Sequence, residues 1–493
     1  QELVKSKQLV KAGVPPAVRI RLRLRGWRHS LREETRMRIV IAGRDEVAFR
    51  LAHKLAGRHE VVLLVADGDD VPDNVDAQVV HGQLTSTSSL QKAGVPSSDV
   101  FVACSRLDER NLVSCVAARR LGAERTICFL FRREAVATMD DDVDVAESLG
   151  IDKVVRPAKQ LAREIVRIVT VPGALDVQLF AGGRVRLLAH LVEEDARVTR
   201  GTLREIGLPQ GVVLVGGRRG ERMFVPKGDT RFEPGDRVIA MGHSKGISKL
   251  MSSYLWGKKH VRERRSATIV GGGSVGLHVA RGLDEAGWSV RVIEADRTRA
   301  ERIAPRVHGL VVHGDGSDLE LLEEEQVSQD SVLVAVTSND EKNLLVSLVA
   351  KSLGVPRIVT RAETHANERL FERVGIDVVR SARGAALDTV LRMIDEDRSQ
   401  MLAELEHGDA EVLDLELPDG VKPRRLAEIH QPVFAIVGAI VRAGRVIIPK
   451  GSDELRGGDH ILVFCTREDE PRVREFFLQG LLEEEKPEPG TAA

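Results

Sequence analysis

The sequence lacks any long apolar run. No stretch of its 493 residues approaches the roughly 18 consecutive apolar residues that a membrane-spanning helix needs. It also lacks an excess of either charge, because 73 Lys and Arg stand against 74 Asp and Glu and the formal net charge is -1. The overall balance therefore favours neither nucleic acid nor an anionic membrane as a partner, and any work at a membrane would be that of a peripheral protein.

Cysteine is scarce and has no metal-binding spacing. The chain holds Cys104, Cys115, Cys128 and Cys465 with no C-x-x-C pair, so a zinc site is not expected. Three of them lie in apolar runs such as VFVAC and TICFL, which predicts buried, unpaired thiols. This cysteine usage fits a reducing cytoplasm.

The two ends of the chain differ in composition from the rest. Residues 1–36 carry ten Lys and Arg against three Glu and show no signal-peptide pattern, so we expect a basic extension without fixed structure. An arm that contacts nucleic acid or lipid stays open as an alternative. Residues 473–493 end in LLEEEKPEPGTAA, which predicts an acidic, frayed tail.

Between these ends the sequence repeats itself. VFVACSRLDERNLVSCVAARRLGA (100–123) matches VLVAVTSNDEKNLLVSLVAKSLGV (332–355). Further on, VPKGDTRFEPGDRVIAMG (225–242) matches IPKGSDELRGGDHILVF (448–464). The parts come in the same order in both halves, which indicates that the chain arose by duplication.

Each copy predicts a parallel α/β domain followed by a smaller module. Short apolar runs alternate with segments of helical periodicity, the pattern of a doubly wound parallel sheet. The segment 384–405 continues the helical pattern as a bridge to a strand-rich module. We therefore expect an α/β chain of two tandem Rossmann-like sheets, each followed by a small α+β module. The expected Rossmann domains are 37–157 and 265–382, and the bridges with their modules are 158–250 and 383–472.

The second copy carries a glycine turn that is typical of dinucleotide binding. Gly271, Gly273 and Gly276 form G-x-G-x-x-G after a predicted strand and at the start of a predicted helix. The first glycine permits the tight turn, the second removes a side chain where a pyrophosphate must approach, and the third lets helix and strand pack closely. The N-terminus of the helix offers N–H groups to the phosphates. A glycine turn without a ligand is the alternative.

An acid follows this turn at the end of the next predicted strand. Glu294 is placed to accept both hydroxyls of an adenosine ribose, which favours NAD over NADP, and Asp296 is the alternative acid. In the first copy the turn reads Gly43, Asp45 and Ala48, Val65 stands at the position of the ribose-binding acid, and Asp67 stands at that of the alternative acid. Because the carboxylate of Asp45 would repel a phosphate, we expect the first copy to bind a dinucleotide weakly or not at all. An adenine nucleotide held in a shifted position is the alternative.

Together these features resemble the RCK (regulator of potassium conductance) proteins, and among them the double-RCK, TrkA-type regulatory subunits of Trk potassium-uptake systems. The resemblance covers about residues 37–470. It rests on the Gly271–Gly276 turn, on VVHGDGSDLELL (311–322), VAVTSNDEKNLL (334–345) and IVTRAETHANERLFERVGIDVV (358–379), and on the duplicated PKG…GD modules. It implies a cytoplasmic regulatory subunit, peripheral on the inner face of the cell membrane, whose partner is a membrane-embedded Trk/Ktr-type potassium-translocating subunit.

The resemblance also implies an assembly and a ligand. Four copies of the chain would form a homotetramer whose eight RCK folds make one ring, and a conformational change of that ring would gate the transporter. The ligand that drives this change would be NAD or NADH, with ATP or ADP as the alternative.

The resemblance assigns a set of second-copy residues to the nucleotide. In chain order they are Gly271, Gly272, Gly273, Ser274, Val275, Gly276, Glu294, Ala295, Asp296, Gly314, Asp315, Thr337, Ser338 and Arg361. The glycine turn would hold the pyrophosphate and Glu294 the adenosine ribose. Gly314 and Asp315 would flank the adenine, and Thr337 and Ser338 would line the second ribose.

Arg361 would donate to the phosphates as a charged hydrogen-bond donor. The first copy departs from this pattern, because Phe129 stands where the second copy has Arg361 and Cys104–Ser105 is taken to replace Thr337–Ser338. One copy therefore looks retained for assembly and the other for sensing.

An NAD-dependent oxidoreductase is the alternative function, because the same turn opens many such enzymes. Hydride transfer needs a substrate pocket and a residue that exchanges the substrate's proton. The sequence shows no His-Asp pair, no Ser-x-x-x-Tyr-x-x-x-Lys spacing and no carboxylate-histidine cluster. We therefore expect no catalytic and no metal-binding residue, and a regulator in place of an enzyme. A DNA-binding redox sensor would need a basic helix-turn-helix, which residues 1–36 do not show.

Overall fold

The computed structural model describes most of the chain. The described residues are 36–57, 59–72, 75, 77–131, 148–220, 222–257, 265–395, 401–405, 409–429, 432 and 435–483. The basic extension expected over residues 1–36 lies outside this part of the chain except for Arg36, as does the end of the expected tail after residue 483. In the described part, every helix is too short or too polar to cross a membrane.

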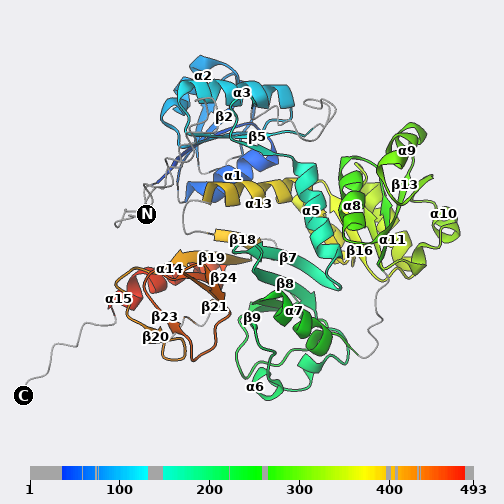
Figure 1. Ribbon diagram of the computed structural model, residues 1–493. Coiled ribbons are helices and arrows are strands. Elements are labelled where there is room, and N and C mark those ends of the chain that lie inside the picture. The colour runs from blue at the N-terminus through cyan, green and yellow to red at the C-terminus, as the bar shows by residue number, and fades with distance from the viewer. Residues whose placement is uncertain are drawn as a thin grey trace, which may run out of the picture.

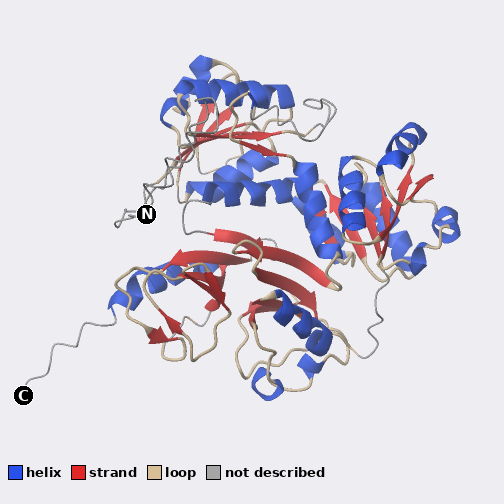
Figure 2. Cartoon of the chain, in the orientation of Figure 1, coloured by secondary structure: helices blue, strands red, loops and turns tan. Residues whose placement is uncertain are grey.

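Two sheets of the same topology lie at the top and at the right of the molecule in the view of Figures 1 and 2. The strands of the first are β1 (Arg38–Ala42), β2 (Glu60–Val65), β3 (Gln78–His81), β4 (Val100–Ala103), β5 (Arg125–Phe129) and β6 (Lys153–Val155). The strands of the second are β12 (Ser266–Val270), β13 (Ser289–Glu294), β14 (Leu310–His313), β15 (Val332–Ala335), β16 (Ile358–Ala362) and β17 (Val378–Ser381). The central strands are almost fully buried apolar runs, as expected of strands covered on both faces.

The strand order of these sheets is β3-β2-β1-β4-β5-β6 and β14-β13-β12-β15-β16-β17, with parallel neighbours throughout. The helices in the described part of the first domain include α1 (Glu46–Ala56), α2 (Thr87–Lys92) and α3 (Asp108–Leu121). Those of the second are α8 (Ser274–Glu285), α9 (Arg297–Ile303), α10 (Leu319–Glu324), α11 (Asp340–Ser352) and α12 (His365–Arg373). The expectation of two Rossmann-like doubly wound sheets is confirmed.

An antiparallel module follows each Rossmann domain. The first module has strand order β10-β9-β11-β8-β7, and the second has β18-β19-β24-β21-β22 with a separate pair β20-β23. The first comprises β7 (Ala174–Phe180), β8 (Val185–Leu191), α6 (Leu203–Ile206), β9 (Val212–Arg219), β10 (Arg222–Phe224), β11 (Arg237–Gly242) and α7 (Ser244–Leu250). The second comprises β18 (Met401–Leu405), β19 (Ala410–Glu416), β20 (Arg424–Arg425), β21 (Ala435–Arg442), β22 (Arg445–Ile447), β23 (Glu454–Leu455), β24 (His460–Thr466), α14 (Glu470–Glu475) and α15 (Leu481–Glu483).

The two modules pack against each other, as Figure 2 shows where their strands meet. Met241 of the first and Phe464 of the second belong to one buried cluster. A Cβ at Gly216 would lie 2.6 Å from a ring carbon of Phe464, and a Cβ at Gly438 would lie 2.5 Å from the sulfur of Met241. The close approach of the sheets therefore depends on glycine at both positions. The small α+β modules that the sequence predicts are confirmed.

Two expectations about the second module and its tail are wrong. The helical bridge predicted over 384–405 ends at Asp395, and residues 401–405 form strand β18, which pairs with β19. The run MLAEL consists of good helix formers, but pairing along the sheet edge outweighs that weak preference. The tail predicted from residue 473 begins as helix, because Val473, Phe477 and Leu481 are buried against the second module.

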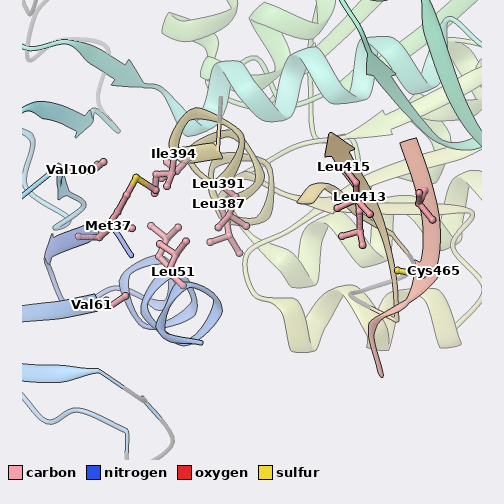
Figure 3. Close-up of a cluster of buried hydrophobic side chains, with 14 of the residues drawn as sticks. Met37, Leu51, Val61, Val100, Leu387, Leu391, Ile394, Leu413, Leu415 and Cys465 are labelled. Carbon is pink, nitrogen blue, oxygen red and sulfur yellow. The ribbon is translucent and has the colours of Figure 1, made fainter. Parts of the chain in front are cut away.

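The helices that leave each Rossmann domain cross to the other copy. These crossing helices are α5 (Pro157–Val169) and α13 (Ala382–Asp395). The apolar face of α5 packs on α8 of the second domain, where Val166 closely approaches Gly282. The apolar face of α13 packs on α1 of the first domain, and Figure 3 shows Leu387, Leu391 and Ile394 beside Leu51.

An arginine of the receiving domain holds the C-terminal end of each crossing helix. Buried Arg357 donates to the carbonyl oxygens of Ile168 and Val171, each at 3.1 Å, and also to that of Ala174. In the first domain, Arg125 donates to the carbonyl oxygen of Met393 at 3.4 Å. Cations are favourable at this end of a helix, where carbonyl groups lack helical partners. The two copies are therefore interlocked. All four cysteines are buried and free, which the sequence predicted for three of them.

Candidate nucleotide site

The G-x-G-x-x-G turn joins β12 to α8. Gly271 has φ +107°, a backbone conformation that favours glycine. A Cβ at Gly276 would lie 1.9 Å from the carbonyl oxygen of Gly271, so the helix can approach the turn only with glycine there. At Gly273, by contrast, nothing lies within 4 Å of the place that a Cβ would occupy. The turn therefore leaves open space beside the start of α8.

The start of α8 has the form of an anion site. Gly273 is the N-cap residue and supplies no side-chain cap, so no side chain competes with a ligand for the first N–H groups of the helix. Ser274 is exposed beside this end. The Val275 side chain is buried in the core, so this residue offers a ligand only its backbone N–H.

Glu294, at the end of β13, lies directly against the turn. One carboxylate oxygen accepts the N–H of Gly272 at 2.7 Å, and the other accepts the N–H of Asp296 at 2.9 Å. Arg299 contacts the second oxygen at 3.3 Å. Asp296 itself caps α9 by accepting the N–H of Arg299 at 2.8 Å, and Ala295 between the two acids is exposed. Of the two predicted acids, Glu294 lies nearer to the turn.

Gly314 and Asp315 follow β14 on the neighbouring side. The N–H of Gly314 donates to the carbonyl oxygen of Glu294 at 3.0 Å, which fixes this loop beside β13. Asp315 accepts from the ammonium group of Lys342 at 2.7 Å and from the hydroxyl and N–H of Ser317. These bonds, with that from Lys342 the strongest, lower the pKa of Asp315 to about 2. The carboxylate is therefore ionised at neutral pH.

Asn343 brings the ends of β15 and β16 together. Its buried amide oxygen accepts from the N–H and hydroxyl of Thr337 at 2.9 and 2.7 Å, and its NH2 group donates to the carbonyl oxygens of Thr337 and Arg361 at 3.1 and 3.0 Å. Ser338 is exposed next to this network. The Arg361 guanidinium contacts a carboxylate oxygen of Glu363 at 2.5 Å.

The predicted residues thus gather where the strands of the second sheet end, at their carboxyl ends. A Cβ at Gly271 would lie only 3.0 Å from the nitrogen of Thr337, so the turn and the end of β15 are in contact. The strand order reverses between β12 and β15, which is where ligands bind to open parallel sheets. Glu294 and Arg361 lie at the carboxyl ends of the strands on either side.

The first copy keeps part of this network, and one predicted equivalence is wrong. The N–H and hydroxyl of Ser105 donate to Asn111 at 2.8 and 2.7 Å, and Asn111 donates to the carbonyl oxygens of Ser105 and Phe129. Ser105 therefore corresponds to Thr337, and the predicted match of Cys104–Ser105 to Thr337–Ser338 is shifted by one residue. Cys104 is buried directly after β4, as Val336 is after β15, so Cys104 corresponds to Val336.

Asp45 occupies the turn of the first copy in a way that the sequence does not show. Its carboxylate caps α1 by accepting the N–H of Glu46 at 2.7 Å. Arg383, from the crossing helix of the second copy, approaches the same oxygen at 3.5 Å, and Arg106 lies at 3.9 Å. An Asp before a helix is a recognisable capping signal. Arg383 has no such signal, because it stands 338 positions later in the chain.

Comparison with known proteins gives the same two-copy arrangement. The model of the TrkA-N domain matches residues 39–157 and 267–382, and that of the TrkA-C domain matches residues 187–254 and 421–478. The chain is 33% identical over 444 residues to the Trk system potassium uptake protein TrkA homolog of Archaeoglobus fulgidus, covering 90% of this chain and 100% of that protein. It is 27% identical over 459 residues to TrkA of Haemophilus influenzae, covering 90% and 98%.

Solved structures show the same fold. The GsuK RCK domain has a TM-score of 0.56 at 20% identity, covering 91% of this chain and 96% of that one. The GsuK channel bound to NAD has a TM-score of 0.55 at 21% identity, covering 96% and 84%. At this identity the likeness extends to the arrangement of the backbone.

Proposed function

This chain belongs to the TrkA family of Trk potassium-uptake proteins, and from this membership we propose that it is a nucleotide-binding regulatory subunit of a Trk-type potassium transporter. It would lie in the cytoplasm, on the inner face of the membrane, bound to the potassium-translocating subunit. The names of its relatives favour this function over the oxidoreductase alternative. The observation that carries nucleotide binding is the open position at Gly273, between the uncapped start of α8 and the carboxylate of Glu294.

We propose that the copies divide the work. The Rossmann domain over 265–382 would bind the nucleotide, with its pyrophosphate on the glycine turn and its adenosine ribose at Glu294. The domain over 37–157 would bind none, because Asp45 already caps its helix. NAD and NADH are the first ligands to test, since the GsuK channel bound to NAD has this fold, and ATP and ADP are the next.

An exposed apolar face supports ring assembly. On the second copy, Leu345 of α11 is 50% exposed and Val374 after α12 is 44% exposed. The corresponding residues of the first copy, Val113 in α3 and Leu149 before β6, are 52% and 43% exposed. Contact between the first-copy face of one chain and the second-copy face of the next would be heterologous, and such contacts can close a ring. We propose that four chains do so, and that nucleotide binding shifts the ring between conformations that set the state of the transporter.

Titration calorimetry with NAD, NADH, ATP and ADP tests the nucleotide proposal. We expect one nucleotide per chain, and we expect Gly273→Asp to weaken binding by at least about tenfold, because a carboxylate would stand where the phosphates lie. The variant should fold normally. Gly273 has the extended conformation of φ -68° and ψ -169°, and Asp is a preferred residue at the start of a helix.

Ser328→Asp is the matched control, because it adds the same charge at an exposed position before β15. This position lies where the strands begin, at the opposite end of the sheet from the glycine turn. It should bind as the unmodified chain does. If Gly273→Asp binds with unchanged affinity, the site is assigned to the wrong place. Absence of binding for all four nucleotides would rule out the nucleotide proposal itself.

A further inference from the structure

Arg383 joins acidic residues from both copies. It is the second residue of α13, and its guanidinium lies 3.5 Å from a carboxylate oxygen of Asp45 and 3.5 Å from one of Glu46. On its other side it lies 3.0 Å from a carboxylate oxygen of Glu363, which follows β16. The first two acids begin α1 of the first copy, so one side chain connects the turn of the first copy to the sheet of the second.

Glu363 extends this connection into the candidate site. Its second carboxylate oxygen contacts the guanidinium of Arg361 at 2.5 Å. The four side chains Asp45, Arg383, Glu363 and Arg361 therefore form a line of alternating charge, which we call the arginine–carboxylate chain. One end is the turn of the first copy, and the other is the side chain placed to reach the phosphates.

The surroundings of Glu363 allow its carboxylate to serve two arginines. Its backbone N–H donates to both oxygens of Asp340, at 3.0 and 2.9 Å, so the main chain is fixed. Its side chain remains 43% exposed and can pivot. By contrast, Arg361 and Arg383 are mostly buried, at 19% and 16% exposure, where loss of a charged partner costs more than it does at the surface.

The arginine–carboxylate chain occurs in one direction only. In the first copy, Phe131 stands in the place of Glu363, since its N–H donates to Asp108 as that of Glu363 donates to Asp340. Ala158, the second residue of α5, stands in the place of Arg383. The polar connection therefore runs from the second-copy site to the first-copy turn and has no counterpart in the opposite sense among the described residues.

We propose that Glu363 is a positioning residue that reports nucleotide binding at the second copy to the first copy. The proposal rests on the nucleotide site proposed above. Without nucleotide, Glu363 holds Arg361. A phosphate that recruits Arg361 leaves Glu363 to Arg383 alone, which draws Arg383 toward Glu363 and away from Asp45 and Glu46. Glu363 and a phosphate thus compete for Arg361. Because the coupling between two such interactions is reciprocal, Glu363 must also oppose nucleotide binding.

The first test is a double-mutant cycle of nucleotide affinity, measured with NAD by titration calorimetry. We expect Glu363→Gln to bind NAD roughly two- to fivefold more tightly, the range for release of a partly exposed ion pair. Arg361→Gln should bind more weakly. In the Arg361→Gln background, Glu363→Gln should bring no further gain, because no guanidinium remains to be released. Glu341→Gln, which removes an exposed carboxylate from the first turn of α11, is the control and should leave affinity unchanged.

The outcomes separate this proposal from the one it rests on. If the unmodified chain binds none of the four nucleotides, the proposed function fails. If the unmodified chain binds nucleotide but Glu363→Gln has unchanged affinity, Glu363 does not influence the site and the present proposal fails. If Glu363→Gln raises the affinity equally with and without Arg361, Glu363 acts only through its charge, and the present proposal fails as well.

Hydrogen exchange tests the far end of the arginine–carboxylate chain. Nucleotide addition should speed amide exchange in residues 46–52 at the start of α1, because Arg383 withdraws from Asp45 and Glu46. Glu363→Gln should abolish this change while still binding nucleotide. Exchange in α1 that does not respond to nucleotide in the unmodified chain, or that responds equally in Glu363→Gln, would overturn the proposal.

Discussion

Glu164 illustrates what burial does to one charged residue. It lies in the crossing helix α5, and its carboxylate accepts from the guanidinium of Arg380 at 2.8 Å. Burial raises the pKa of Glu164 to about 7, while Arg380 opposes this shift and Asp176 and Asp388 add to it. Asp176 also lies 3.5 Å from Arg380, so two carboxylates share one guanidinium at the junction of the copies.

This raised pKa predicts a pH dependence of stability. The unfolded chain releases the Glu164 proton near its ordinary pKa of 4.5, and the folded protein releases it near 7. Between these values the folded state holds more protons, so its stability falls as the pH rises, by at most about 1.4 kcal/mol per pH unit. Glu164→Gln should remove this contribution. Its melting temperature relative to the unmodified chain should therefore rise from pH 5 to pH 7.5, whereas an equal difference at both pH values would contradict the shift.

At the residue scale, the sequence showed which positions matter but not always which groups their side chains contact. The glycine spacing predicted a turn with an open second glycine, and Gly273 has open space around it. The same reasoning took Asp45 as a source of repulsion alone, whereas the structure adds a helix cap and a contact with Arg383. The partner could not be inferred, because a side chain on a distant helix leaves no mark on the local pattern.

Among the elements, α5 depends on the domain that it crosses to. Arg357 donates to carbonyl oxygens in the last turn of this helix and just beyond it. We expect Arg357→Met to lower the free energy of unfolding by about 2–3 kcal/mol, because buried carbonyl groups would lose a charged donor. Chemical denaturation measures this, and amide exchange should show the loss at the end of α5 first.

Arg297→Met is the matched control. Arg297 makes an exposed ion pair with Glu301 within α9, at 2.9 Å, and such pairs contribute less than about 1 kcal/mol. A similar effect from both substitutions would show that Arg357 does not hold α5 in the way described.

Element types were predicted better than element partners. Apolar runs separated by helical periodicity predicted the parallel α/β layout of the second Rossmann domain, because parallel strands buried on both faces leave a strong pattern. The strand at 401–405 was missed, since its residues favour helix and only pairing with β19 makes them extended. The crossing of α5 and α13 was also missed. An apolar helix face shows that something covers it, but it does not show which copy supplies the cover.

For the whole molecule, the exposed face of α11 predicts the oligomeric state. Light scattering should give a mass well above the 54.1 kDa of one chain, and Leu345→Glu should shift it to smaller species, because a charge would be buried in the contact. The fold should be unaffected, since Leu345 is half exposed.

Leu310→Glu is the matched control, because Leu310 is 53% exposed on the edge strand β14, away from α11. It should leave the mass unchanged. A single-chain mass for the unmodified protein, or an unchanged mass for Leu345→Glu, would contradict assembly through this face.

The interlocking of the copies by α5 and α13 has a consequence for how such a chain can evolve. In a dimer of identical halves encoded once, every substitution strikes both glycine turns, so an Asp that ruins one ruins the other. Here the halves share one polypeptide, and each supplies the helix that completes its neighbour. Selection can therefore adapt one turn to ligand binding and the other to a structural role, while neither half can be lost.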